Sequence, residues 1–277
     1  MILFQRFMPK IVHHVNKWND IVAFNNKKML IAGLFGNALE WYDFILYANF
    51  AAIIAHLYFP NEKPVTALLL TFAVFAIGFL VRPLGAVLFG YIGDHLGRHV
   101  ALITSICLMS LPTLLIGLIP TYASIGLWAP VLLLLLRICQ GLAVSGELNA
   151  ATTFLVEHAA SNKRGLAGSL VMGSAFFGML IGAALSTGLT EWLTPVALID
   201  WGWRAMFILG GLTGLIGLVL RLKLPEPACF EKQQVIAKKM PLWYVFKHYP
   251  KKLILVIALT SIMAVGNYIF VAYIVTF

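Results

Sequence analysis

The sequence predicts an all-α protein that crosses a membrane several times. Of its 277 residues, 61% are hydrophobic and only 11% are charged, whereas soluble domains carry about 25% charged residues. The apolar residues also gather in long runs, and a helix that spans a bilayer needs about 20 of them. These two observations together disfavour a soluble fold.

Seven apolar runs are long enough to be spans: residues 29–58, 65–92, 100–119, 129–156, 165–190, 203–222 and 252–277. Most connections between them are short, so neighbouring helices should run antiparallel. Only the segment 223–251, which is rich in Lys, is long. We therefore expect a basic N-terminal segment (1–28), a six-helix unit (29–222), a linker (223–251) and the first helix of a second unit (252–277).

The distribution of positive charge predicts the orientation in the membrane. The net charge is +9, and most Lys and Arg residues lie in 1–28 and 221–252. Because cytoplasmic loops carry an excess of Lys and Arg, this places the N-terminus in the cytoplasm. The basic charge is thus explained by the bilayer and not by nucleic acid. Segment 1–28 lacks the features of a signal peptide, and we expect that it either lies along the inner membrane surface or is a disordered basic tail.

The first predicted span carries two acids, Glu40 and Asp43, near its middle. A charge at the bilayer centre costs about 2.5–3.5 kcal/mol on insertion scales, so intramembrane acids usually mark a proton or substrate site. Together with Gly33, Gly36 and Tyr47 they repeat at steps of three and four, which places all five on one helical face. Burial favours a neutral carboxyl group, so either acid could accept a proton. The alternative is a structural acid neutralised by an arginine.

Two arginines also lie within predicted spans. Arg137 in 129–156 is a natural counter-ion for Glu40 or Asp43, or a clamp for a substrate carboxylate. Arg82 in 65–92 either contacts the substrate or extends toward the inner membrane surface. Both readings of each arginine stay open from the sequence.

Small residues recur at four-residue spacing in the fifth and sixth predicted spans. Gly178 with Gly182 and Gly210 with Gly214 form GxxxG pairs, and Ser169 with Gly173 forms a related pair. Such spacing lets helix backbones approach closely in lipid. We expect ordinary helix packing at these positions.

No motif of an enzyme is present. HExxH, GxSxG and the phosphate-binding GxxxxGK[ST] are all missing from the sequence. The three cysteines (Cys107, Cys139 and Cys229) are far apart and have no metal-ligand spacing. We therefore expect neither enzymatic activity nor a metal site.

The segment GYIGDHLGRH, residues 90–99, resembles the cytoplasmic loop motif GxxxDRxGRR/K of the major facilitator superfamily. The residues that match the motif are Gly90, Asp94, Gly97 and Arg98. His95 and His99 stand where the motif usually has Arg or Lys, which could make the loop sensitive to pH.

Six further segments resemble the metabolite:proton symporter subfamily, which includes proline/betaine transporters and carriers of 2-oxoglutarate and citrate. They are GNALEWYDFILYA, VRPLGAVLFG, RICQGLAVSGE, EHAASNKRG, WGWRAMFILGG and LKLPEPACFEK, in this order between residues 29 and 232. The resemblance implies a fold of two six-helix halves around a central site that opens alternately to either side. It also implies that the proton gradient drives transport and that no cofactor is needed.

The resemblance assigns gating roles at the cytoplasmic side. Asp94 would contact the second half, and Arg98 would pair with Glu147 at the inner end of the fourth span. We expect substrate and proton binding at Glu40, Asp43, Tyr47, Arg82 and Arg137, and a multi-pass location in the bacterial inner membrane.

A zwitterion such as proline or betaine needs groups of both charges, which the spans supply; a carboxylate substrate is the alternative. Members of the family have both halves, whereas this sequence matches one half plus one helix. A separately encoded second half or a second copy could complete the cavity, and a membrane protein inactive in transport is the remaining alternative.

Overall fold

The computed structural model describes residues 27–159, 161–222 and 246–268, and within these ranges every regular element is helical. The prediction of an all-α protein is confirmed. The chain divides into two units, residues 1–230 and 231–277, of which the first holds the candidate site.

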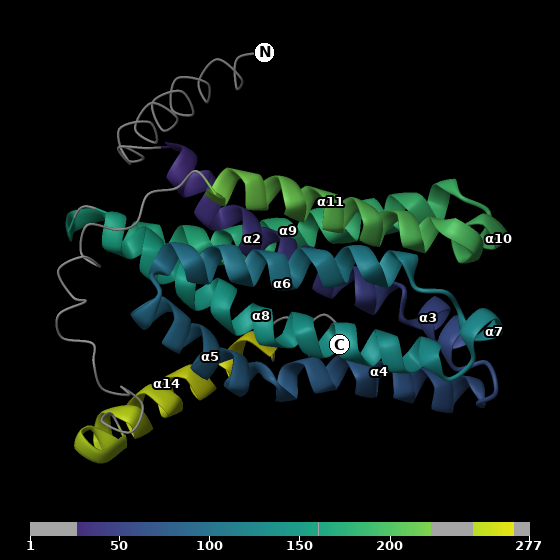
Figure 1. Cartoon of the computed structure of the whole chain (residues 1–277), viewed down its shortest axis with the longest axis horizontal. Coiled ribbons are helices and arrows are strands. Elements are labelled where there is room, and N and C mark those ends of the chain that lie inside the picture. Colours follow the sequence, from purple (N-terminus) through teal and green to yellow (C-terminus); the bar gives the residue numbers. More distant parts are fainter. Residues whose placement is uncertain (1–26, 160, 223–245, 269–277) are drawn as a thin grey trace, which may run out of the picture. The chain divides into compact units, whose positions relative to one another are not determined.

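The first unit consists of long helices and short connecting turns (Figure 1). Its elements are α2 (Lys27–Asn49), α3 (Ala51–Tyr58), α4 (Pro64–Leu80), α5 (Arg82–His95), α6 (Arg98–Leu118), α7 (Tyr122–Ile125), α8 (Trp128–His158), the 3-10 turn η1 (Ser161–Lys163), α9 (Arg164–Trp192), α10 (Pro195–Ala197), the π-helical turn η2 (Leu198–Gly202) and α11 (Trp203–Leu222). The second unit contributes α14 (Pro250–Tyr268).

Five stretches are long and apolar enough to cross a membrane: Pro64–His95, His99–Leu118, Trp128–Val156, Arg164–Trp192 and Pro195–Leu222. A sixth is the pair Gly33–Asn49 and Ala51–Tyr58, which is bent by 64°. These stretches correspond to the first six predicted spans. The seventh, 252–277, is helical as α14 as far as Tyr268, is not among these stretches, and otherwise lies outside the described residues.

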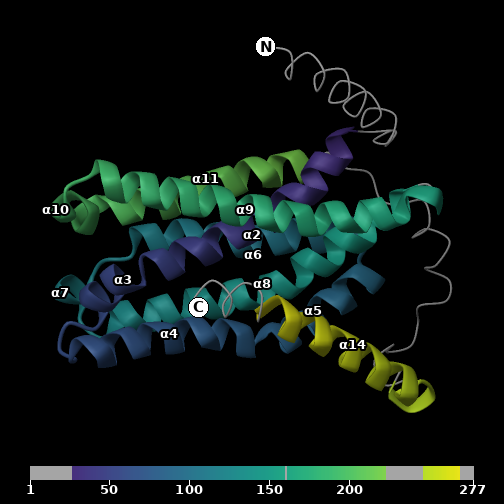
Figure 2. The same ribbon diagram turned by 180° about the vertical axis from the view of Figure 1, so that it is seen from behind.

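The helices of the first unit pack side by side, as both views show (Figures 1 and 2). Helix α2 contacts α9, α11 and α8, helix α6 contacts α11 and α8, and helix α8 contacts α4 and α5. The segment Gly90–His99 joins α5 to α6, and we call the end of the bundle where it lies the motif end. The starts of α2 and α9 and the ends of α8 and α11 lie at this end (Figure 1).

The two larger apolar clusters among the described residues lie toward opposite ends of the bundle. One surrounds Tyr58, Trp203 and Phe207, far from the motif end, and the other surrounds Leu102 and Phe154, near it. The outer surface is also apolar: its many exposed hydrophobic side chains include Leu69, Leu84, Leu180 and Ile216, which are 64%, 64%, 65% and 59% exposed. An outer surface of this kind fits burial in lipid.

Helices α4 and α5 are two halves of one span, with a break at Val81. Pro83 explains the break, because proline has no backbone N–H and its ring clashes with the carbonyl four residues earlier, here that of Phe79. The hydroxyl of Ser145 on α8 donates a hydrogen bond of 2.7 Å to the carbonyl of Arg82 at this point. This hydrogen bond holds the start of α5, where Arg82 lies, against α8.

Glycines permit the closest helix contacts. A Cβ atom at Gly178 would overlap the backbone of Ala38, and one at Gly182 would lie 3.0 Å from the carbonyl oxygen of Tyr42, so α9 lies directly on α2. On α11, Cβ atoms at Gly210 and Gly214 would crowd side chains of both α2 and α6, among them Tyr42 and Ser110. The packing role predicted for the two GxxxG pairs is confirmed, whereas Gly173 has open space beside it.

Helix α8 makes backbone contact with α4 and α5 in the same way. A Cβ atom at Gly141 would overlap the carbonyl group of Gly78, and one at Gly85 would lie 2.9 Å from the carbonyl carbon of Leu142. No side chain separates the backbones at these two points.

Candidate functional site

Asp43 is the centre of a buried polar cluster that joins α2, α6 and α8. Its Oδ2 accepts a hydrogen bond of 2.7 Å from Nη1 of Arg137, and its Oδ1 accepts bonds of 3.1 Å from Thr113 and from Gln140. Asp43 is 1% exposed and Arg137 is 5% exposed. Of the arginines named in the sequence, Arg137 is thus the counter-ion of Asp43.

Gln140 connects the members of this cluster. Its Oε1 accepts a hydrogen bond of 2.8 Å from Nη1 of Arg137, while its Nε2 donates to Asp43 and, at 2.8 Å, to the hydroxyl of Thr113. One amide therefore serves both signs of charge, which fixes the ion pair in one geometry. Neither Gln140 nor Thr113 was predicted as a site residue.

The aromatic ring of Tyr47 packs against the guanidinium group of Arg137. The guanidinium carbon of Arg137 lies 3.8 Å from the centre of the Tyr47 ring, a cation–π contact. The ring of Phe75 stacks on that of Tyr47 with centroids 5.1 Å apart, and the hydroxyl of Tyr47 donates a hydrogen bond of 3.1 Å to the carbonyl oxygen of Thr71. Asp43 and Tyr47, two of the five residues predicted to share one face of α2, thus both contact Arg137 of α8.

Glu40 lies one turn from Asp43 but stands outside its hydrogen-bond cluster. The side chain is 5% exposed, and its Oε2 is buried without a hydrogen-bond partner among the residues that the structure describes. Glu40 lines a small pocket together with Asp43, Arg82, Arg137 and Gln140. The pocket has a volume of about 30 Å³. It has room for one charged group of a solute, and the rest of the solute would extend out of the pocket.

Arg82 lies in the same pocket, at the first residue of α5. Its guanidinium carbon lies 4.1 Å from the centre of the Phe79 ring, a second cation–π contact. The structure thus brings Glu40, Asp43, Arg82 and Arg137 to one pocket.

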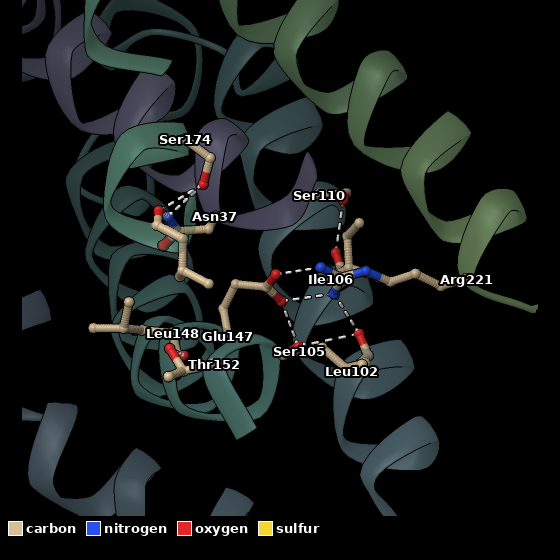
Figure 3. Close-up of polar contacts among 11 residues, drawn as sticks. Asn37, Leu102, Ser105, Ile106, Ser110, Glu147, Leu148, Thr152, Ser174 and Arg221 are labelled. Atoms are coloured by element: carbon tan, nitrogen blue, oxygen red, sulfur yellow. Dashed lines mark hydrogen bonds and ion pairs between the residues drawn. The ribbon is translucent and has the colours of Figure 1, made fainter. Parts of the chain in front are cut away.

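Figure 3 shows a second buried ion pair. Its acid, Glu147, lies closer than Arg137 to the end of α8, which is at the motif end. Both Nη1 and Nη2 of Arg221 on α11 bind the carboxylate of Glu147 on α8, with Nη1 at 2.7 Å from Oε2. Nη1 also donates to the carbonyl of Leu102 at 2.8 Å, and the hydroxyl of Ser105 donates to Glu147 at 2.7 Å. Arg221 is fully buried.

Helix α2 closes this cluster. A Cβ atom at Gly36 would overlap the side chains of Glu147 and Arg221, so glycine leaves the room that the pair occupies. The ring Nε2 of His99 lies 2.6 Å from the carbonyl oxygen of Arg221. The predicted partner of Glu147, Arg98, has a side chain outside the described ones, and the pairing stays a prediction. The contact with Arg221 was not predicted.

The glycines of the loop motif have different surroundings. Gly97, between α5 and α6, has φ 114° and ψ 152°, a conformation essentially restricted to glycine. Gly90 on α5 has open space beside it. Asp94 on the same helix is half-buried. Its predicted contact with a second six-helix half stays a prediction.

Comparison with known proteins identifies the family. The family model described as sugar (and other) transporter matches residues 28–234. The chain belongs to this family. Among solved structures, the fold of this transporter family member is similar to that of the proton:xylose symporter XylE of the major facilitator superfamily, with a TM-score of 0.67 and 18% identity over 77% of this chain and 48% of XylE. A partially occluded, inward-open form of XylE from E. coli gives a TM-score of 0.66 over 88% and 61% of the two chains.

Curated relatives are more similar in sequence. A Staphylococcus aureus (strain COL) protein, assigned provisionally as a proline/betaine transporter, is 39% identical over 94% of this chain and 56% of its own length. The glycine betaine/proline/ectoine/pipecolic acid transporter OusA of Dickeya dadantii is 40% identical over 74% and 41%, and the proline/betaine transporter of Salmonella typhimurium is 38% identical over the same shares. This member therefore spans about half the length of the relatives it matches, and the predicted resemblance to proline/betaine transporters is confirmed.

Proposed function

We propose that the chain forms the N-terminal half of a proton-coupled symporter for a small zwitterionic solute such as proline or betaine. The observation that carries the proposal is one pocket within the bundle, lined by Glu40, Asp43, Arg82 and Arg137. Groups of both signs at one intramembrane pocket fit a solute that carries both charges. The names of the relatives support the same class of solute.

The proton gradient is the driving force of this proposal, and no cofactor takes part. Glu40 and Asp43 are the candidate proton carriers, because they are the acids of the pocket. The site would open alternately to the two sides of the bacterial inner membrane, with the N-terminus of the chain in the cytoplasm. The wall opposite the pocket would come from a second half or a second copy of the chain.

Gating belongs to the motif end in this proposal. Gly90, Asp94, Gly97 and Arg98 form the segment that would contact the second half, and Glu147 on α8 would pair with Arg98. The ion pair of Glu147 with Arg221 supports this role, since it ties α8 to the last helix before the linker.

A carboxylate such as 2-oxoglutarate is the second candidate solute. The pocket favours it to the extent that two cationic groups, Arg82 and Arg137, line it. However, Nη1 of Arg137 is already bound to Asp43, which leaves less positive charge for a ligand with two carboxylates. The zwitterion is therefore the better fit.

Uptake by membrane vesicles tests the proposal. Vesicles that contain the chain, alone or together with the C-terminal half of the Salmonella relative, receive labelled proline, glycine betaine or 2-oxoglutarate, with or without a proton gradient. We expect gradient-dependent uptake of proline or glycine betaine above that of empty vesicles. Equal uptake with and without the gradient contradicts symport, preference for 2-oxoglutarate supports the carboxylate carrier, and no uptake in either form supports an inactive protein.

A further inference from the structure

The two acids of α2 lie in opposite chemical surroundings. Asp43 accepts hydrogen bonds from Arg137, Thr113 and Gln140, so both of its oxygens are engaged. Oε2 of Glu40 is equally buried but has no hydrogen-bond partner within the described part of the chain. Of these two acids, Glu40 is therefore the one with a buried oxygen that no described residue engages.

Arg137 is divided in the same way. Its Nη1 is bound to Asp43 and Gln140, whereas its Nε and Nη2 are buried without a hydrogen-bond partner among the described residues. The N–H groups of Nε and Nη2 point in parallel from one edge of the guanidinium plane. This is the edge that binds a carboxylate through two hydrogen bonds.

The surroundings of Arg137 hold this edge in place. Asp43 and Gln140 fix Nη1, and the ring of Tyr47 lies against the guanidinium face. A side chain fixed in this way loses little freedom when a ligand binds, which favours affinity. Asp43 thus has a clear structural task that does not require contact with a solute.

Buried polar atoms are almost always hydrogen-bonded, and exceptions need an explanation. Here an acceptor on Glu40 and two donors on Arg137 find no hydrogen-bond partner among the residues that the structure describes, and both residues line the same pocket. A zwitterion supplies the missing partners, with its carboxylate for the donors and an ammonium N–H for the acceptor.

We propose that the Nε and Nη2 edge of Arg137 binds the carboxylate of the solute, that Oε2 of Glu40 binds its ammonium group, and that Asp43 positions Arg137 without touching the solute. This assignment rests on the proposed function and adds which acid meets the solute. Because Glu40 offers a hydrogen-bond acceptor, an amine with N–H groups, such as proline, uses it better than the fully methylated amine of glycine betaine.

The test compares proline with cyclopentanecarboxylate, which has the same ring and carboxylate but no nitrogen. Equilibrium binding of both is measured on the full chain in lipid nanodiscs. Glu40→Gln should weaken proline binding about tenfold, the worth of one charge-assisted contact, and leave cyclopentanecarboxylate binding unchanged. Arg137→Lys keeps the charge but loses the two parallel donors Nε and Nη2, and should therefore weaken the binding of both ligands.

Asp43→Asn separates a positioning residue from a ligand-binding one. It should weaken the binding of both ligands by the same factor, because it acts through Arg137. Loss of a contact with the ammonium group would instead weaken the binding of proline alone. Glu62→Gln, an exposed acid remote from the pocket residues in the sequence, is the matched control and should change neither. Glu40→Asp, which keeps the charge, provides a second variant if Glu40→Gln does not fold, and should retain a preference for proline.

The outcomes separate this inference from the proposed function. If the chain binds proline and Glu40→Gln leaves that binding unchanged, or weakens both ligands equally, the inference is wrong while proline transport stands. If Glu40→Gln weakens the binding of proline alone, but uptake by vesicles is equal with and without the proton gradient, the inference stands and symport is wrong. A wild-type chain that binds cyclopentanecarboxylate as tightly as proline, or binds neither, overturns the inference.

Discussion

Arg221 binds both carboxylate oxygens of Glu147, a residue 74 positions earlier in the chain, and both side chains are buried. The pair joins α11 to α8, with Leu102 and Ser105 of α6 completing its hydrogen bonds. Gly36 of α2 packs against it. Four helices of the bundle therefore meet at one ion pair.

Breaking this pair on one side should destabilise the bundle. In Glu147→Leu, the guanidinium group of Arg221 stays buried without its carboxylate, and we expect a loss of about 3–5 kcal/mol in the free energy of unfolding. Unfolding by denaturant in detergent micelles, followed by circular dichroism, measures the loss.

The double variant Glu147→Leu with Arg221→Met is the control for this experiment. It replaces the pair by apolar side chains and should recover most of the stability, since a well-packed apolar pair can match a buried ion pair. A double variant as unstable as Glu147→Leu would contradict this account.

Tyr47 should support Arg137 mainly through its ring. Tyr47→Phe removes only the hydrogen bond to the carbonyl of Thr71 and should cost about 0.5–1.5 kcal/mol, with solute binding retained. Tyr47→Ala removes the ring against which Arg137 and Phe75 pack and should cost about 3–5 kcal/mol. Thermal unfolding together with proline binding distinguishes the two; equal loss of binding in both variants would assign the role to the hydroxyl.

Gly178 should tolerate no side chain, because α9 touches the backbone of α2 there. Gly178→Ala is expected to cost about 1–3 kcal/mol through overpacking. Gly173→Ala on the same helix has open space and should be neutral or stabilising by up to about 1 kcal/mol. Melting temperatures in one detergent compare the two, and equal shifts would exclude a special contact at Gly178.

Gly97 should be required by its backbone conformation. Gly97→Ala forces a Cβ atom onto a residue with φ 114° and should cost about 1–3 kcal/mol. Gly90→Ala, in α5 with open space beside it, should instead stabilise the helix by up to about 1 kcal/mol. Denaturant unfolding of the two variants measures both effects; a stabilising Gly97→Ala would show that the turn differs from the one described.

The sequence predicted the pocket because its signals lie within single helices. Acids spaced by three residues on α2 and single arginines inside apolar runs stand out against lipid. Gln140 and Thr113 gave no such signal, since an uncharged polar residue in a span is unexceptional and its partners lie on other helices. Arg221 was missed for another reason: at the end of a span, an arginine is indistinguishable from the flanking positive charges that set orientation.

Helix existence was also more predictable than helix shape. The run 29–58 was predicted as one span, yet α2 and α3 meet at a bend of 64°. Hydrophobicity does not encode such a bend, and Phe50 between the two helices is neither Gly nor Pro. The break in 65–92 does have a local cause in the sequence, Pro83, but the break was not predicted from it.

The direct backbone contacts of Gly141 with Gly78 and of Gly85 with Leu142 limit how this half can work. A slide of α8 along the α4–α5 pair would bring neighbouring residues, which carry Cβ atoms, onto backbone contacts that have room only for glycine. In the proposed transport cycle, these helices would therefore move together as one rigid block while the pocket opens to one side of the membrane and then to the other, with the adjustment taken up at the edges of the unit.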